Sequence, residues 1–180
     1  MRPAIMISLI IPLTAFSLAA APQSDSRSAG NRSQQRLGQS IYRELVMLPQ
    51  YDVFDNLGYR INGDSVELFG QVTKPNLKAE AERAVEGIEG VSKVVNNIEV
   101  LPPSDSDDRI RMAVYRALFS NSSLERYAMQ AVPPIHIIVK NGRVSLEGVV
   151  SSQADKDLAN LLASQVPGIF SVTNNLRVED

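Results

Sequence analysis

The chain has 180 residues, enough for one medium domain or two small ones, and a formal net charge of −2. That charge argues against a general nucleic-acid-binding protein, which needs clustered positive charge. The sequence has no cysteine, which excludes disulfides, thiol nucleophiles and cysteine-bound zinc. Because no phosphate-binding loop or metal-ligand spacing occurs either, we expect neither a cofactor nor a metal.

The first 21 residues have the layout of a secretory signal peptide. Arg2 precedes an apolar run from Ala4 to Leu18, and three alanines follow it. The alternative is a membrane anchor, but Pro12 interrupts the run, which is short for crossing a bilayer. We therefore expect signal cleavage and an exported protein, periplasmic or secreted. Because no cysteine follows the run, we expect no permanent membrane anchor after cleavage.

An internal repeat organises the rest of the chain. At an offset of 78 residues, residues 61–100 align without a gap with residues 139–178 and match at 11 of 40 positions. Further upstream the offset falls to 73, so the second copy has about five extra residues, which we place within residues 121–134. We predict a disordered polar leader at residues 22–35, unit 1 at residues 36–102 and unit 2 at residues 103–180.

Each unit begins with an amphipathic helix and continues into a hairpin. Apolar residues recur at helical spacing over residues 37–48 and 110–118. Asn62-Gly63 and Asn141-Gly142 then separate alternating apolar runs, which is a strong hairpin signal. Gly70 and Gly148 fall on the apolar face of the second hairpin strand, where we expect a helix to approach closely.

Three aspartates precede the first helix of unit 2, namely Asp105, Asp107 and Asp108. A calcium-binding loop is the alternative to helix capping, but it needs a glycine at its sixth position and a glutamate at its twelfth. Ile110 and Arg116 occupy those positions. The pattern therefore favours carboxylates placed at the positive end of a helix dipole.

A second amphipathic helix and a closing strand complete each unit, and Gly90 or Gly168 follows that helix. The order α-β-β-α-β predicts an α+β fold of two small units. Each unit should hold a three-stranded mixed sheet covered by two helices.

The closing strands contain an unusual asparagine pair, in Val-Val-Asn-Asn-Ile-Glu-Val (residues 94–100) and Val-Thr-Asn-Asn-Leu-Arg-Val (residues 172–178). Asn96 and Asn174 share the alternation of the apolar residues, so we expect them to point inward and to bond a nearby helix end or turn. Asn97 and Asn175 should be more exposed. The alternative is a bulge that breaks the alternation.

These motifs resemble the BON domain, a bacterial module named for osmotically induced and nodulation proteins. The resemblance rests on Gly-Arg-Val-Ser-Leu-Glu-Gly-Val-Val (residues 142–150), on the two asparagine-containing segments and on the duplicated order of elements. It implies a non-catalytic envelope protein that binds phospholipid or envelope surfaces and supports tolerance of osmotic or envelope stress. The alternative is a protein–protein interaction module of the bacterial envelope.

Anionic lipid would be contacted by clustered basic side chains. The candidates lie on or near the second helix of unit 1 and on the first helix of unit 2, and they are Lys74, Lys78, Arg83, Lys93, Arg109, Arg111 and Arg116. For a protein partner, Tyr51, Phe54, Tyr59 and Phe69 are candidate exposed aromatics. Phe69 should lie on the sheet face that points away from the helices.

An enzyme is the least favoured class for this sequence. His136 is the single histidine, and unit 1 has Gly58 at the matching position. We interpret His136 as an ordinary, partly exposed strand residue. The sequence has no Ser-His or Cys-His arrangement, so we assign no catalytic residue.

Overall fold

The computed structural model describes residues 24–130 and 133–179, and the predicted signal peptide lies outside them. Unit 1 has the predicted order of elements. Its helices and strands are α1 (Ser24–Val46), β1 (Asn56–Asn62), β2 (Ser65–Val72), α2 (Pro75–Glu86) and β3 (Lys93–Val100).

Unit 2 repeats this order with one addition, a one-turn helix within residues 121–134, where we placed the extra residues. Its elements are α3 (Asp105–Phe119), α4 (Glu125–Ala128), β4 (Ile135–Lys140), β5 (Arg143–Val150), α5 (Gln153–Ser164), β6 (Ser171–Asn174) and β7 (Arg177–Val178). The α+β class and the α-β-β-α-β order are therefore confirmed.

Each sheet is mixed, with the second hairpin strand in the centre. β1 pairs antiparallel with β2, and β3 pairs parallel with β2 from Ser65↔Lys93 to Val72↔Val100. In unit 2 the equivalent strands pair in the same register, from Arg143↔Ser171 to Val150↔Val178. β6 and β7 therefore form one edge of the sheet, interrupted only at residues 175–176. The register is unchanged across the interruption, which excludes a bulge at the second asparagine pair.

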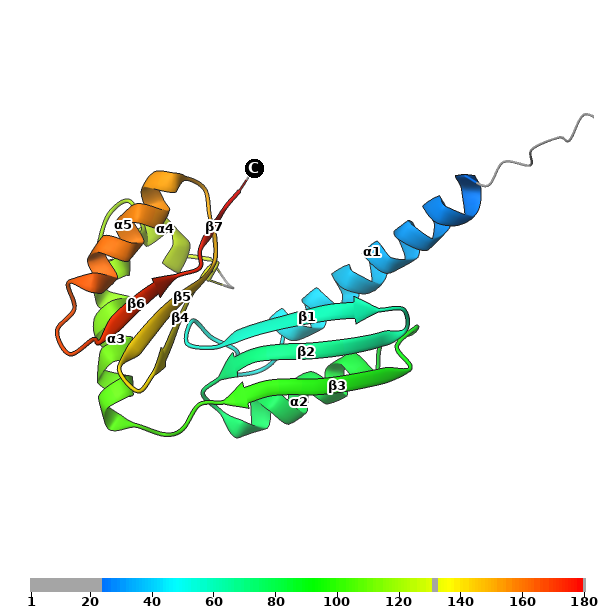
Figure 1. Cartoon of the computed structure of the whole chain (residues 1–180), viewed down its shortest axis with the longest axis horizontal. Helices are drawn as coiled ribbons and strands as arrows, with labels where there is room; N and C mark the ends of the chain where they lie inside the picture. The colour runs from blue at the N-terminus through cyan, green and yellow to red at the C-terminus, as the bar shows by residue number, and fades with distance from the viewer. Residues whose placement is uncertain (1–23, 131–132, 180) are drawn as a thin grey trace, which may run out of the picture.

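Both helices of a unit cover the same face of its sheet, and in Figure 1 α1 also extends past the ends of the strands. The core of unit 1 is built from apolar residues of α1, α2 and the inward sheet face, among them Ile41, Leu68 and Leu77. Phe69 lies on the outer face with 39 % of its surface exposed, as predicted. Each core is small, so its stability depends on every inward position being filled.

Residues 24–35 differ from the expected disordered leader, because the structure places them in α1. They carry serine, glutamine and arginine rather than proline, and these residues tolerate a helix. Residues 32–36 are exposed, whereas Leu37 is half-buried and packs against the core of unit 1. The packed half of the helix thus supplies the nucleus from which the polar half extends.

Gly70 and Gly148 are required for a different reason from the one we expected. The atoms nearest to a Cβ added at either glycine belong to the neighbouring chain segment and not to a helix, and the carbonyl oxygen of Asn56 or Pro134 would lie 2.0 Å away. Both glycines also have positive φ, 118° and 116°. The second hairpin strand therefore needs glycine for close approach of a backbone carbonyl and for a backbone conformation that other residues avoid.

Gly90 and Gly168 lie in turns rather than directly after the helices. α2 ends at Glu86 and α5 at Ser164, and each glycine follows four residues later with positive φ. A Cβ at either position would meet open space. Their requirement for glycine is therefore conformational only.

The asparagine prediction is confirmed. The Nδ2 groups of Asn96 and Asn174 donate to the carbonyl oxygens of Lys78 and Lys156, each at 2.8 Å. Lys78 and Lys156 are themselves counterparts at the offset of 78, so the same bond ties the closing strand to the second helix in both units. The following residues, Asn97 and Asn175, are exposed.

Candidate functional site

The basic residues predicted near α2 do not form a positive surface. The ammonium of Lys74 is held by the carbonyl of Gln50 at 3.2 Å and by Asp52 at 3.5 Å. Lys78 is half-buried, and Arg83 is exposed and donates to a carbonyl of its own helix. Three glutamates lie on the same helix, Glu80, Glu82 and Glu86, so α2 as a whole is acidic. Lys93 is exposed at the start of β3.

The structure corrects the prediction that Arg111 contacts lipid. Only 5 % of its surface is exposed, so it cannot reach a lipid surface. One guanidinium nitrogen donates to the carbonyl of Val139 at 2.7 Å, and another pairs with Asp108. Buried Asp107 accepts the backbone N–H groups of Asn141 and Gly142, each at 2.8 Å. Both side chains therefore fasten α3 to β4 and the hairpin turn.

Arg109 and Arg116 remain on the exposed face of α3. They are seven residues apart, which is about two turns, so their side chains leave the helix on the same side. Met112 lies between them with 41 % of its surface exposed. This arginine–methionine stripe combines positive charge with an apolar side chain, the combination that suits the interface of an anionic membrane.

A second arginine pair, which the residue-by-residue reading missed, lies on α1. Arg36 and Arg43 are exposed and are the counterparts of Arg109 and Arg116 at the offset of 73. The sequence from residue 26 to residue 43 contains four arginines and no acidic residue. The repeat itself was the signal that could have found this pair. Within the described residues, the exposed guanidinium groups of Arg36, Arg43, Arg109 and Arg116 form no ion pair.

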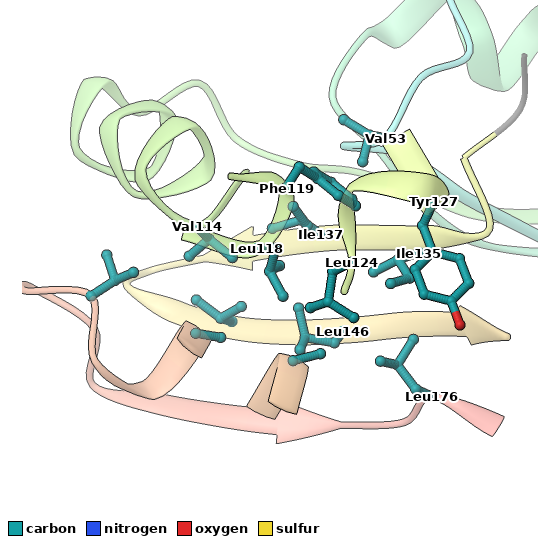
Figure 2. Close-up of a cluster of buried hydrophobic side chains, with 14 of the residues drawn as sticks. Val53, Val114, Leu118, Phe119, Leu124, Tyr127, Ile135, Ile137, Leu146 and Leu176 are labelled. Atoms are coloured by element: carbon teal, nitrogen blue, oxygen red, sulfur yellow. The ribbon is translucent and has the colours of Figure 1, made fainter. Parts of the chain in front are cut away.

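The two units are joined by the turn at residues 51–55, which connects α1 to β1 and docks on unit 2. The carbonyl of Val53 accepts the N–H of Ile137 on the edge of β4 at 2.7 Å. The Val53 side chain is buried in the core cluster of unit 2, and Figure 2 shows it beside Phe119 and Ile137. The ring of Phe54 meets the edge of Tyr115, with 6.1 Å between centroids. Unit 2 therefore receives part of its core from unit 1.

The structure also corrects the prediction that His136 is partly exposed, because only 8 % of its surface is exposed. We expected a partly exposed strand residue, but unit 1 covers this position of β4, and the hydroxyl of Tyr51 lies 3.4 Å from His136 Nε2. His136 Nδ1 is buried and has no hydrogen-bond partner among the described residues. Burial lowers the pKa of this imidazole, while the backbone carbonyls of Asp52 and Asp55 act against that shift.

A groove of about 410 Å³ lies beside this junction. One wall comes from α1, through Tyr42 and Val46, and from β1, through Leu57 and Tyr59. Unit 2 supplies the other wall, which includes His136. The groove is large enough for a pair of side chains and is mainly apolar and aromatic on the side of unit 1.

The described residues contain no group of three or more histidine, aspartate or glutamate side chains placed to hold a metal ion. None of the described helices combines the length and the apolar character needed to cross a membrane.

A family model for the BON domain matches this chain twice, at residues 60–102 and 106–180. The chain belongs to the BON-domain family. Both matches include the second hairpin strand, the second helix and the closing strand, so the repeat found in the sequence is a repeat of BON units. The unit boundaries at residues 36–102 and 103–180 remain predictions, since the first match begins inside β1.

Osmotically-inducible protein Y of Escherichia coli strain K12 is 32 % identical to this BON protein over 116 residues. The matched region is 63 % of this chain and 57 % of the relative, so the similarity spans little more than half of that protein.

Two solved structures of CdsD, a structural protein of the type III secretion system of Chlamydia trachomatis, were also found. One is its C-terminal domain, which is 13 % identical with a TM-score of 0.27, covering 79 % of this chain and 96 % of that one. The other is 14 % identical with a TM-score of 0.29, covering 81 % and 94 %. Such low scores carry no argument about this BON protein.

Proposed function

We propose that this protein is a non-catalytic component of the bacterial envelope that binds anionic phospholipid surfaces reversibly. The observation that carries the proposal is the pair of exposed arginines on the first helix of each unit, Arg36 with Arg43 and Arg109 with Arg116. The exported, periplasmic or secreted location belongs to the same proposal and rests on the signal-like first 21 residues.

The strength of such binding follows from charge. A lysine or arginine near an anionic membrane surface contributes about 1 kcal/mol, and the attraction falls off within a Debye length. The arginine pair Arg36 and Arg43 on α1, the pair Arg109 and Arg116 on α3 and the exposed Met112 therefore give weak, salt-sensitive attachment rather than insertion. Reversible attachment suits a protein that must cover and leave a surface as conditions change.

A role in osmotic or envelope stress is the broader part of the proposal. It is supported by membership of the BON-domain family and by the similarity to a relative named for osmotic induction. The absence of catalysis is proposed because the single histidine is buried at the junction of the units, in a structural setting.

The lipid part is tested by co-sedimentation with vesicles of phosphatidylglycerol and phosphatidylcholine at low ionic strength. The double variants Arg36→Gln/Arg43→Gln and Arg109→Gln/Arg116→Gln should each weaken binding by about thirtyfold, because each removes two charges that contribute about 1 kcal/mol apiece. The matched control is Arg143→Gln/Arg177→Gln, which removes two exposed arginines outside these helices. It should bind nearly as well as the unmodified protein.

Three results would contradict this assignment. No binding to anionic vesicles at low salt would remove the lipid proposal altogether. Binding that is insensitive to salt would argue against an electrostatic surface. An equal loss in the control would mean that net charge, and not the helix faces, governs attachment.

A further inference from the structure

The junction of the two units shows how a BON unit of this chain receives a foreign segment. Unit 2 accepts the turn at residues 51–55 through a backbone bond to the N–H of Ile137 and through the ring of Tyr115. The ring centroids of Tyr115 and Phe119 are in turn 4.9 Å apart. The turn is itself held in shape by Asp52, whose carboxylate accepts the N–H of Phe54 at 2.8 Å.

Unit 1 carries the same receiving positions. At the offset of 73, Tyr115 corresponds to Tyr42 and Phe119 to Val46; at the offset of 78, Ile137 corresponds to Tyr59. All three counterparts line the groove of about 410 Å³. Tyr42 is 58 % exposed. A position that is filled in unit 2 is therefore an open groove in unit 1.

The backbone edge is also equivalent. Ile137 faces Leu146 across the β4–β5 hairpin, and Tyr59 faces Leu68 across the β1–β2 hairpin in the same register. Because the N–H of Ile137 points away from its hairpin to meet Val53, the N–H of Tyr59 points to the outer edge of β1. An unpaired strand edge beside an aromatic groove is a site for a partner backbone.

We propose that this groove, lined by Tyr42, Val46 and Tyr59, binds a turn of another polypeptide that presents a branched aliphatic residue followed by an aromatic one. The occupant is a partner protein rather than a second copy of this chain, because each copy's own turn is already engaged. That engagement is intramolecular and so has a high effective concentration. The proposal is independent of lipid binding, which uses the arginines on the outer faces of α1 and α3.

The test uses the full chain and a peptide of residues 50–56, Gln-Tyr-Asp-Val-Phe-Asp-Asn, with benzoylphenylalanine in place of phenylalanine. We expect saturable binding with a Kd below about 1 mM and photo-crosslinks to α1 between residues 42 and 46 or to β1. Tyr42→Ala should weaken binding by about fivefold to tenfold, because an aromatic contact is lost. Glu44→Ala, an exposed change on the same helix, should leave binding unchanged.

The proposal fails if the peptide does not bind up to about 1 mM while circular dichroism shows a folded chain. It also fails if the crosslinks fall on residues 115–119 of unit 2, because the peptide would then be displacing the internal turn. Unchanged affinity in Tyr42→Ala is a third contrary result. Crosslinks between two copies of the chain, with a dimer by light scattering, would assign the groove to self-association instead.

Discussion

The two units differ most in the segment that joins the first helix to the first strand. In unit 1 this segment is short, and buried Asp55 accepts the N–H of Thr73 at 2.6 Å. In unit 2 the longer segment forms α4, and the hydroxyl of Tyr127 accepts the N–H of Ser151 at 2.8 Å. Thr73 and Ser151 are counterparts, so equivalent backbone N–H groups are bound by a carboxylate in unit 1 and by a phenol hydroxyl in unit 2.

This difference explains why the units have unequal roles at their junction. In unit 2, Leu124 and Tyr127 fold back from the longer segment and bury themselves in that unit's own core. In unit 1 the short segment instead turns outward and places Val53 in the core of its neighbour. Divergence of one connection thus made unit 1 a donor and unit 2 an acceptor, while the sheets kept one register.

The largest expected effect on stability concerns Gly70 and Gly148, which have the same structural role in both units. Gly70→Ala and Gly148→Ala should each lower the free energy of unfolding by about 3–5 kcal/mol, because the new Cβ overlaps a backbone carbonyl and the positive φ is strained. Gly90→Ala and Gly168→Ala are the controls, since they change φ preference alone and should cost about 1 kcal/mol. Urea unfolding measures all four; equal costs in the two pairs would exclude the carbonyl overlap.

The next largest effect concerns Asp55 and Tyr127, the different side chains that bind equivalent backbone groups in the two units. Asp55→Ala leaves the N–H and hydroxyl of Thr73 without their acceptor, and should cost about 2–3 kcal/mol. Tyr127→Phe keeps the ring but removes the hydroxyl that bonds Ser151 and Asp155, and should cost about 1–2 kcal/mol.

Hydrogen exchange locates the two effects. Asp55→Ala should open the start of α2, and Tyr127→Phe the start of α5. If both variants increase exchange in the same unit, the Asp55 carboxylate and the Tyr127 hydroxyl do not have equivalent structural roles.

Much of one unit could be predicted from sequence, because its determinants are local. The inward position of Asn96 follows from alternation, and its recurrence as Asn174 indicates a structural bond. His136 shows the limit. Its strand position was predicted, but nothing in the sequence indicated that the Tyr51 turn covers it. Burial by another unit is a non-local property, and the same reasoning applies to Arg111, whose acceptor is 28 residues away.

The junction also predicts a pH dependence of stability that arises from His136 in unit 2. Burial lowers the pKa of His136 in the folded protein, so the unfolded chain takes up this proton first, near its ordinary pKa of about 6.5. Stability is therefore full above that pH and is lost as the pH falls through and below it. Desolvation raises the pKa of the nearby Asp55 carboxyl, which acts in the opposite direction at lower pH.

Urea unfolding at pH 7.5 and 5.5 measures this dependence. The unmodified protein should lose more stability between the two values than His136→Phe, which keeps a ring but cannot be protonated. Asp55 and the other carboxylates of the junction are present in both proteins, so their contribution cancels in the difference. A loss of the same size in both would mean that His136 does not sense pH.

The smallest effect compares the two asparagine bonds. Asn96→Ala and Asn174→Ala should each cost about 1 kcal/mol, because the acceptors at Lys78 and Lys156 already belong to helices and remain partly satisfied. Asn96 also donates to Glu82 at 3.1 Å, whereas unit 2 has Asn160 at that position. Asn96→Ala should therefore cost a few tenths of a kcal/mol more, and in a Glu82→Ala background that excess should vanish. A larger cost for Asn174→Ala would show that the interrupted edge of β6 and β7 depends more on its asparagine than the continuous β3 does.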